Sequence, residues 1–288
     1  MSIRNVFYNP ALNYSSFDPD RVLRTTVTIW FAAALLGQLF FATYTFVRYG
    51  LPIASGEYQH INLSGNISGY EEGDLSGNVM LYAHLIPAAL LSLGGIFQLW
   101  PAARKRWPVL HRWNGRMFML LAVLGSLTGL YLTWLRGSRL SDVGSIGVSI
   151  NGVLIILAVI MAWRYALTRN MALHKRWAVH AFFLVNGVWT FRLMLMGWYL
   201  ANQGPNGNTN TLDGPVDLFF SFACYLIPML IAELVFWAQR HKSQTVKWWV
   251  TGITAAGCFA TLFGVMANIF MSWIPRMTKS IAAFNGVI

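Results

Sequence analysis

Residues 144–163 read GSIGVSINGVLIILAVIMAW, a run of twenty residues that contains no charged side chain. An α-helix rises about 1.5 Å per residue, so this run is long enough to cross the roughly 30 Å hydrocarbon layer of a bilayer. The whole chain has a matching composition, because 56% of its 288 residues are hydrophobic and only 11% are charged. The sequence therefore predicts a membrane protein rather than a soluble globular domain.

Six further apolar runs of similar length lie on either side of this one. The seven predicted spans are Thr26–Tyr49, Val79–Trp100, Met117–Leu135, Gly144–Trp163, Trp177–Leu200, Val216–Trp237 and Trp248–Trp273. Tryptophans gather near the ends of these runs, as is typical of residues that prefer the membrane–water interface. We predict an all-α fold, a polytopic transmembrane helical bundle of seven helices with a four-helix core at 79–200.

Basic residues are divided unevenly between the two sides of the predicted bundle. Fifteen Lys and Arg residues fall on the side of the N-terminus and five on the other side. Because cytoplasmic loops are enriched in basic residues, we expect the N-terminus in the cytoplasm and the C-terminus outside it, in a bacterial inner membrane. The chain then divides into a cytoplasmic segment 1–25, a membrane domain 26–273 and an extracytoplasmic tail 274–288. This asymmetry accounts for the net charge of +11 without a nucleic-acid partner.

A short sequence pattern occurs twice at predicted cytoplasmic helix entries. Residues 110–113 read LHRW, and residues 173–177 read LHKRW. The repetition has two interpretations. Two similar helical hairpins point to a duplicated core, whereas basic residues and tryptophan also anchor unrelated helices at this interface.

Polar and aromatic residues recur in a set order through the middle of the chain. They are His84, Gln98, Trp100-Pro101, Pro108, His111-Arg112-Trp113, Gly115-Arg116, Gly129-Leu130, His174-Lys175-Arg176-Trp177, Thr190 and Arg192. In this order the chain resembles the bacterial predicted-membrane-protein family called domain of unknown function 2306, over roughly residues 80–200. The resemblance implies a four-helix fold and a candidate site, but no reaction. It also implies a basic residue where this chain has His180.

Ionisable residues inside the predicted spans are candidates for function, because a charge in the membrane is costly. His84 and Arg192 differ in depth by about 4–5 Å at the helical rise, so we predict that they face each other. His180 and Glu233 share a depth near the inner end. Arg192 and Glu233 are about 15 Å apart in depth and are not expected to pair.

A b-type haem is one interpretation of the histidines on the predicted cytoplasmic side. Two neutral imidazoles at matched depth on helices of one bundle can hold a haem iron between them. His111 and His174 are the predicted axial ligands, with His180 as the substitute for His174. The arginines predicted to pair with the haem propionates are Arg112, Arg116 and Arg176. Only His84 lies in a helix on the outer side, so a two-haem pattern is not met.

The same residues allow other functions. A basic cluster at the predicted cytoplasmic side is also suited to a quinone or to an anionic lipid headgroup. It consists of His111, Arg112, Arg116, Lys175 and Arg176. Alternatively, His84, Arg192 and Glu233 could line the path of a small-solute transporter, although no span shows the paired Gly/Pro interruptions of broken transporter helices. A non-catalytic membrane protein and a homo-oligomer also remain open. The chain lacks the common nucleotide, hydrolase and zinc motifs, so whether it is an enzyme is undecided.

Overall fold

The fold was analysed in a computed structural model, which describes residues 18–63 and 69–285. Most of the predicted segment 1–25 therefore lies outside the described residues. The described chain consists of helices and their connections, with no strand among them. Six helices are long and apolar enough to cross a membrane, and a bent pair of helices gives a seventh candidate span when its two halves are counted together. The predicted all-α membrane bundle is confirmed.

The seven spans follow the predicted runs but extend beyond them at several ends. The first comprises α1 (Pro19–Thr45), the π-helical turn η1 (Phe46–Gly50) and α2 (Leu51–Ser55), and the short helix η2 (Tyr58–Asn62) follows. The next are α3 (Leu75–Leu99), the short α4 (Pro101–Arg106), α5 (Pro108–Leu130) with the π-helical turn η3 (Tyr131–Leu135), and α6 (Asp142–Leu167). The last are α7 (Met171–Val185), α8 (Gly187–Ala201), α9 (Pro215–Ala238), and α10 (Gln244–Asn268) with η4 (Ile269–Trp273) and α11 (Ile274–Phe284).

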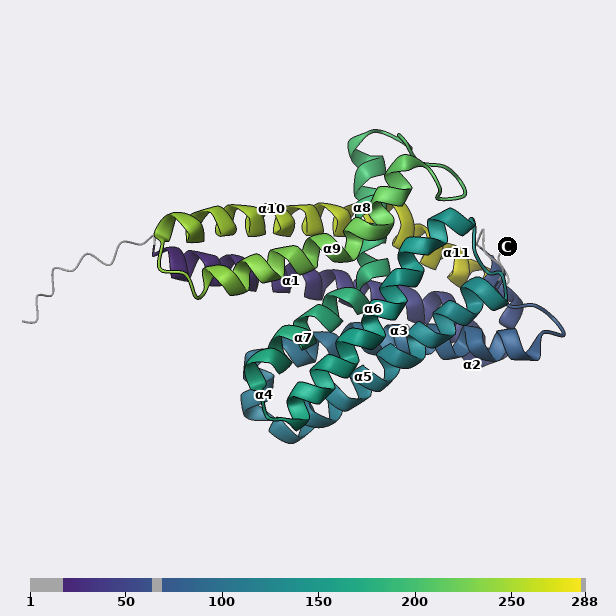
Figure 1. Ribbon diagram of the computed structural model, residues 1–288. Coiled ribbons are helices and arrows are strands. Elements are labelled where there is room, and N and C mark those ends of the chain that lie inside the picture. The colour runs from purple at the N-terminus through teal and green to yellow at the C-terminus, as the bar shows by residue number, and fades with distance from the viewer. Residues whose placement is uncertain (1–17, 64–68, 286–288) are drawn as a thin grey trace, which may run out of the picture.

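The helices form two groups (Figure 1). In one group α3 packs against α5 and α6 packs against α7, while in the other α1 packs against α10. The fifth span belongs to both groups, because α7 contacts α6 whereas α8 contacts α10 and α9. The residues predicted as an extracytoplasmic tail begin with a further helix, α11.

The fifth span is broken, although no paired Gly/Pro interruption marks it. Its halves α7 and α8 meet at Asn186 with a bend of 52°. Asn186 donates from Nδ2 to the Phe182 carbonyl (2.8 Å) and accepts at Oδ1 from Gln38 Nε2 (2.5 Å). Asn151 donates to the carbonyl of Leu184 (3.0 Å) near the end of α7. These amides add hydrogen bonds around the bend, and side-chain partners of this kind are one way in which membrane helices tolerate a break.

The two ends of the bundle differ in chemistry. One end, called here the basic end, carries the α3–α5, α6–α7 and α9–α10 connections and the start of α1. An ion pair between Lys247 on α10 and Asp20 on α1 (2.5 Å) joins these two helices at this end. The other, the long-loop end, carries the segments 56–74, 136–141 and 202–214. There, the pKa of Asp74 is lowered, because the Gly77 N–H and the Arg136 guanidinium both donate to its carboxylate.

Arg48 is a deeply buried charge at the long-loop end. It lies in η1 and is only 2% exposed. Its guanidinium donates to the backbone carbonyls of His60 (2.6 Å) and Ile61 (2.7 Å) in η2. Arg48 therefore attaches the segment after α2 to the first span.

The orientation of the bundle leads to a first testable prediction. Residues 70, 140 and 210 all lie in connections at the long-loop end. Because the basic end should remain in the cytoplasm, enzyme-reporter fusions at these three positions are expected to report an extracytoplasmic location. Fusions at residues 107 and 170, in connections at the basic end, are the matched controls and should report the cytoplasm. Cytoplasmic signals from any two of the first three positions would contradict the orientation.

Candidate functional site

Three of the predicted site residues meet at the basic end around one carboxylate. Glu233 on α9 accepts from Arg176 on α7 through both nitrogens of a two-pronged ion pair, with Nε 2.7 Å from Oε1. His180, one turn further along α7, lies with Nε2 2.6 Å from the same Oε1. The shared depth of His180 and Glu233 thus corresponds to a direct contact, and Arg176 completes the arrangement. Glu233 holds α7 against α9 by a charge-assisted, bidentate interaction of the strong kind.

Burial distinguishes the two partners of Glu233. The His180 side chain is 9% exposed, whereas that of Arg176 is 45% exposed. His180 Nδ1 is buried and has no hydrogen-bond partner among the described residues. The ring donates through Nε2 to Glu233, so the neutral tautomer carries a lone pair on Nδ1.

His111 and His174 occupy the first turns of α5 and α7 at the same end. His174 Nδ1 lies 2.9 Å from the Ala162 carbonyl of α6, so Nδ1 carries the proton and Nε2 has a free lone pair. His111 Nδ1 is buried without a partner among the described residues. Arg104 and His174 are both close enough to act electrostatically on His111. His111 and His174 are therefore neighbours, and each has a ring nitrogen without a partner among the described residues, as does His180.

The remaining predicted arginines lie at the surface of this end. Arg116 is stacked over the ring of Trp113, with its guanidinium carbon 5.0 Å from the ring centroid. Arg112 is exposed, and no carboxylate among the described residues pairs with it. Arg112 is thus available to an anionic group, while Arg176 is already bound to Glu233.

His84 and Arg192 lie in the membrane, nearer the long-loop end. His84 donates from Nδ1 to the Gly125 carbonyl of α5 at 2.9 Å. Arg192 is close enough to act electrostatically on His84. Among the described residues no hydrogen bond joins the two side chains, so their direct pairing remains a prediction.

The polar residues at the break of the fifth span were not singled out from the sequence. Gln38, Asn151 and Asn186 are 1%, 4% and 6% exposed, and all three are uncharged. A search restricted to ionisable residues passes over them. The available signal was an amide within an otherwise apolar run, since each such group must find a hydrogen-bond partner in the membrane.

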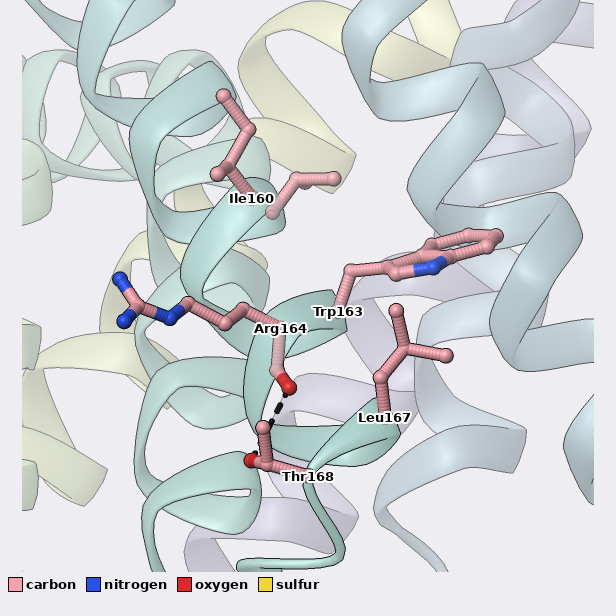
Figure 2. A pocket seen from close by; sticks show the side chains of 6 residues that line it. Ile160, Trp163, Arg164, Leu167 and Thr168 are labelled. Atoms are coloured by element: carbon pink, nitrogen blue, oxygen red, sulfur yellow. Dashed lines mark hydrogen bonds between the residues drawn. The ribbon is translucent and has the colours of Figure 1, made fainter.

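A shallow furrow of about 450 Å³ runs along the outer face of α6 near the basic end. It is lined by Val159, Ile160, Trp163, Arg164, Leu167 and Thr168. Figure 2 shows Arg164 and Trp163 pointing to opposite sides of the helix, with the Thr168 hydroxyl bonded to the Arg164 carbonyl. The furrow is an apolar surface, and none of the candidate histidines lines it. The described residues also contain no group of three or more His, Cys, Asp or Glu that could hold a metal ion.

Comparison with known proteins gives one match. A family model described as "Predicted membrane protein (DUF2306)" matches residues 81–236, more than half of the chain. No curated protein and no solved structure matches. The matched segment begins in α3 and ends in α9, so it contains His84, His111, His174, Arg192 and Glu233.

Proposed function

Since the chain belongs to the DUF2306 family of predicted membrane proteins, and its matched segment brings two histidines together at the basic end, we propose that it is a redox-associated protein that binds a b-type haem there. His111 and His174 would be the axial ligands. The proposal includes an inner-membrane location with the basic end in the cytoplasm, in agreement with the distribution of Lys and Arg.

The proposal is carried by the state of the two imidazole rings. Histidines that bind a metal usually donate their other ring N–H to a backbone carbonyl or a carboxylate, which fixes the tautomer and orients the ring. His174 donates such a bond from Nδ1 to the Ala162 carbonyl, which leaves Nε2 for another partner. His111, which lies near His174, has a buried ring nitrogen without a partner. Two imidazoles on different helices, each with a ring nitrogen that has no partner among the described residues, suit bis-histidine ligation.

The other charged residues at the basic end differ in whether they are free to pair with a haem propionate. Arg112, one of the predicted propionate partners, is exposed and lies at the same end. Arg104, which was not among the predicted partners, also lies there and is a further candidate. Arg176 is already bound to Glu233. His180 donates to the same carboxylate and keeps a buried Nδ1 without a partner among the described residues, so it stays the substitute for His174. When bound, a haem would supply one-electron redox chemistry at this end. The chain's own residues would hold the ring and balance its charge.

The haem proposal predicts a defined absorption spectrum. The full chain, expressed with ample haem supply and purified in mild detergent, is expected to show sharp α and Soret bands in its reduced-minus-oxidised spectrum. His111→Ala and His174→Ala should each abolish these bands, because one imidazole cannot provide six-coordinate ligation. His180→Ala should retain them.

The control for this spectrum is His60→Ala, at the long-loop end, where His60 pairs with Glu57 (3.0 Å). Each variant is checked for monodisperse elution, so that loss of haem is not confused with loss of the fold. A colourless wild-type preparation, or bands that survive in both His111→Ala and His174→Ala, would reject the proposal. A quinone or an anionic lipid headgroup bound by the same basic cluster would leave the preparation colourless.

A second candidate function is transport of a small solute, and the broken fifth span favours it. Discontinuous helices with free half-helix ends form the substrate sites of many secondary transporters. The break at Asn186 lies among buried amides from α1 and α6. This candidate requires a binding site within the membrane near α8.

A further inference from the structure

Arg192 is a charged residue inside the membrane that has no counter-charge in the described structure. It lies in α8, nine residues before the final residue Ala201, so about 13 Å of helix separates it from that end. No carboxylate among the described residues forms a salt bridge with it. The phenols of Tyr44 and Tyr49 are close enough to interact with it electrostatically, but no hydrogen bond from the guanidinium to a described residue is found. Intramembrane charges usually pair with another group or line a ligand path. The guanidinium therefore has free donors.

A second unpartnered donor lies on the same face of α8. Trp189 precedes Arg192 by three residues, so the two side chains are neighbours along the helix surface. Trp189 is 8% exposed, and its indole Nε1 is buried without a hydrogen-bond partner among the described residues. The indole N–H can only donate, so it calls for an acceptor.

Both side chains face the same stretch of α1. Trp189 packs so closely on Gly37 that a Cβ at that position would lie 2.7 Å from the indole Cζ2. Arg192 lies over Phe41, one turn further along α1, with its guanidinium carbon 5.5 Å from the ring centroid. The contacts place the two donors between α1 and α8, in the middle part of the first span.

The first turn of α8 supplies a third set of hydrogen-bond donors. Because the fifth span is broken, α8 begins inside the bundle at Gly187, and Trp189 is its third residue. The N-terminal turn of a helix has free backbone N–H groups and a positive partial charge. A half-helix that begins within a membrane presents this charge to anionic groups in transporters.

We propose that Arg192, Trp189 and the first turn of α8 bind a small anion, such as chloride or a short-chain carboxylate, within the membrane. An anion accepts hydrogen bonds and donates none, which matches two donors without acceptors. It also neutralises the guanidinium charge, which the described residues leave uncompensated. The site lies on α8 and α1, apart from His111 and His174, so it does not depend on haem binding.

The proposal is tested by anion-dependent stability of the purified full chain in a non-ionic detergent. Chloride or acetate is titrated at constant ionic strength, with the larger anion gluconate as replacement. A ligand that binds the folded state raises the melting temperature in a saturable manner, which gives an apparent dissociation constant. We expect saturable stabilisation of the wild type by chloride or acetate, relative to gluconate.

Variants assign this effect to the site. Arg192→Gln should raise the apparent dissociation constant by about 10-fold or more, because a hydrogen bond to a charged group contributes roughly 1.5–3 kcal/mol. Trp189→Phe retains the ring against Gly37 but removes the N–H, and should raise the constant by about 3-fold or more. Arg164→Gln, an exposed arginine on α6, is the matched control and should leave the constant unchanged.

Several outcomes would overturn the proposal. One is identical anion dependence in wild type and Arg192→Gln, and another is equal stabilisation by gluconate. If the titration responds only to an anionic phospholipid added to the detergent, the ligand is a lipid headgroup and not a small anion. A water bridge from Trp189 to the unpartnered Gln38 Oε1 would give no anion dependence. Trp189→Phe preserves packing, so it also tests the site if Arg192→Gln fails to fold.

Discussion

Replacing Arg48 with methionine is expected to lower the free energy of unfolding by about 2–5 kcal/mol, although it leaves the helices of the bundle intact. Methionine retains much of the apolar stem, so the change removes the guanidinium rather than opening a large cavity. The carbonyls of His60 and Ile61 then lose their donor in a buried place. Each such unsatisfied group costs roughly 1–3 kcal/mol.

The measurement is equilibrium unfolding in mixed detergent micelles, combined with limited proteolysis of the segment 56–74. Cleavage there should become faster in Arg48→Met than in wild type. Arg48→Lys is the matched control, because an ammonium group still donates to a carbonyl but lacks the fork geometry; it should fall between the two. An unfolding free energy within about 0.5 kcal/mol of wild type, together with unchanged cleavage, would show that the loop is held by other contacts.

Gly264→Ala is expected to separate α8 from α10 and to destabilise the protein by about 1–3 kcal/mol. A Cβ at Gly264 would lie 2.7 Å from the Leu193 carbonyl oxygen and 3.0 Å from its carbon, which are backbone atoms that cannot rotate away. The helices would have to move apart. That movement would strain the bond that Asn268 on α10 donates to the Arg192 carbonyl on α8 (2.9 Å).

The control for this prediction lies on the same helix. A Cβ at Gly252 has no atom within 4 Å, so Gly252→Ala should be neutral or stabilising through the higher helix propensity of alanine. The two variants add the same methyl group to α10 and differ only in its surroundings. Equal unfolding free energies for Gly264→Ala and Gly252→Ala would mean that α8 and α10 are not in close contact in the membrane.

The sequence predicted the elements and their depths because both depend on simple lengths. Six of the seven apolar runs correspond to single candidate spans and the other corresponds to the bent pair α7 and α8, since a helix must contain about 20 apolar residues to cross the bilayer. The fixed rise per residue also placed His180 and Glu233 at one level, and they are in contact. Rotation about the helix axis is not given by length. The sequence therefore could not predict the direction of the Arg176 side chain, which turns toward Glu233 rather than toward His111.

The break of the fifth span could not be predicted from the local sequence. Asn186 and Gly187 are weak signals, since an Asn-Gly pair also occurs within unbroken helices. What stabilises the bend is a pair of amides from distant parts of the chain, Gln38 and Asn151. Their contribution follows from tertiary packing, which composition and periodicity do not report. His111 and His174, in contrast, were predicted as haem ligands from residue type and position, and this role remains a proposal that the spectrum tests.

The lengths of α7 and α8 have a consequence for how the chain is made. Each half contains 15 residues, which corresponds to about 22 Å of helix and falls short of the roughly 30 Å hydrocarbon layer. Neither half can cross alone, so the insertion machinery must accept 171–201 as one segment. Gln38 is synthesised long before this segment and Asn151 shortly before it, so both amides are already in place when Asn186 arrives. The bend can therefore form as soon as the fifth span enters the membrane, before α9 and α10 are synthesised.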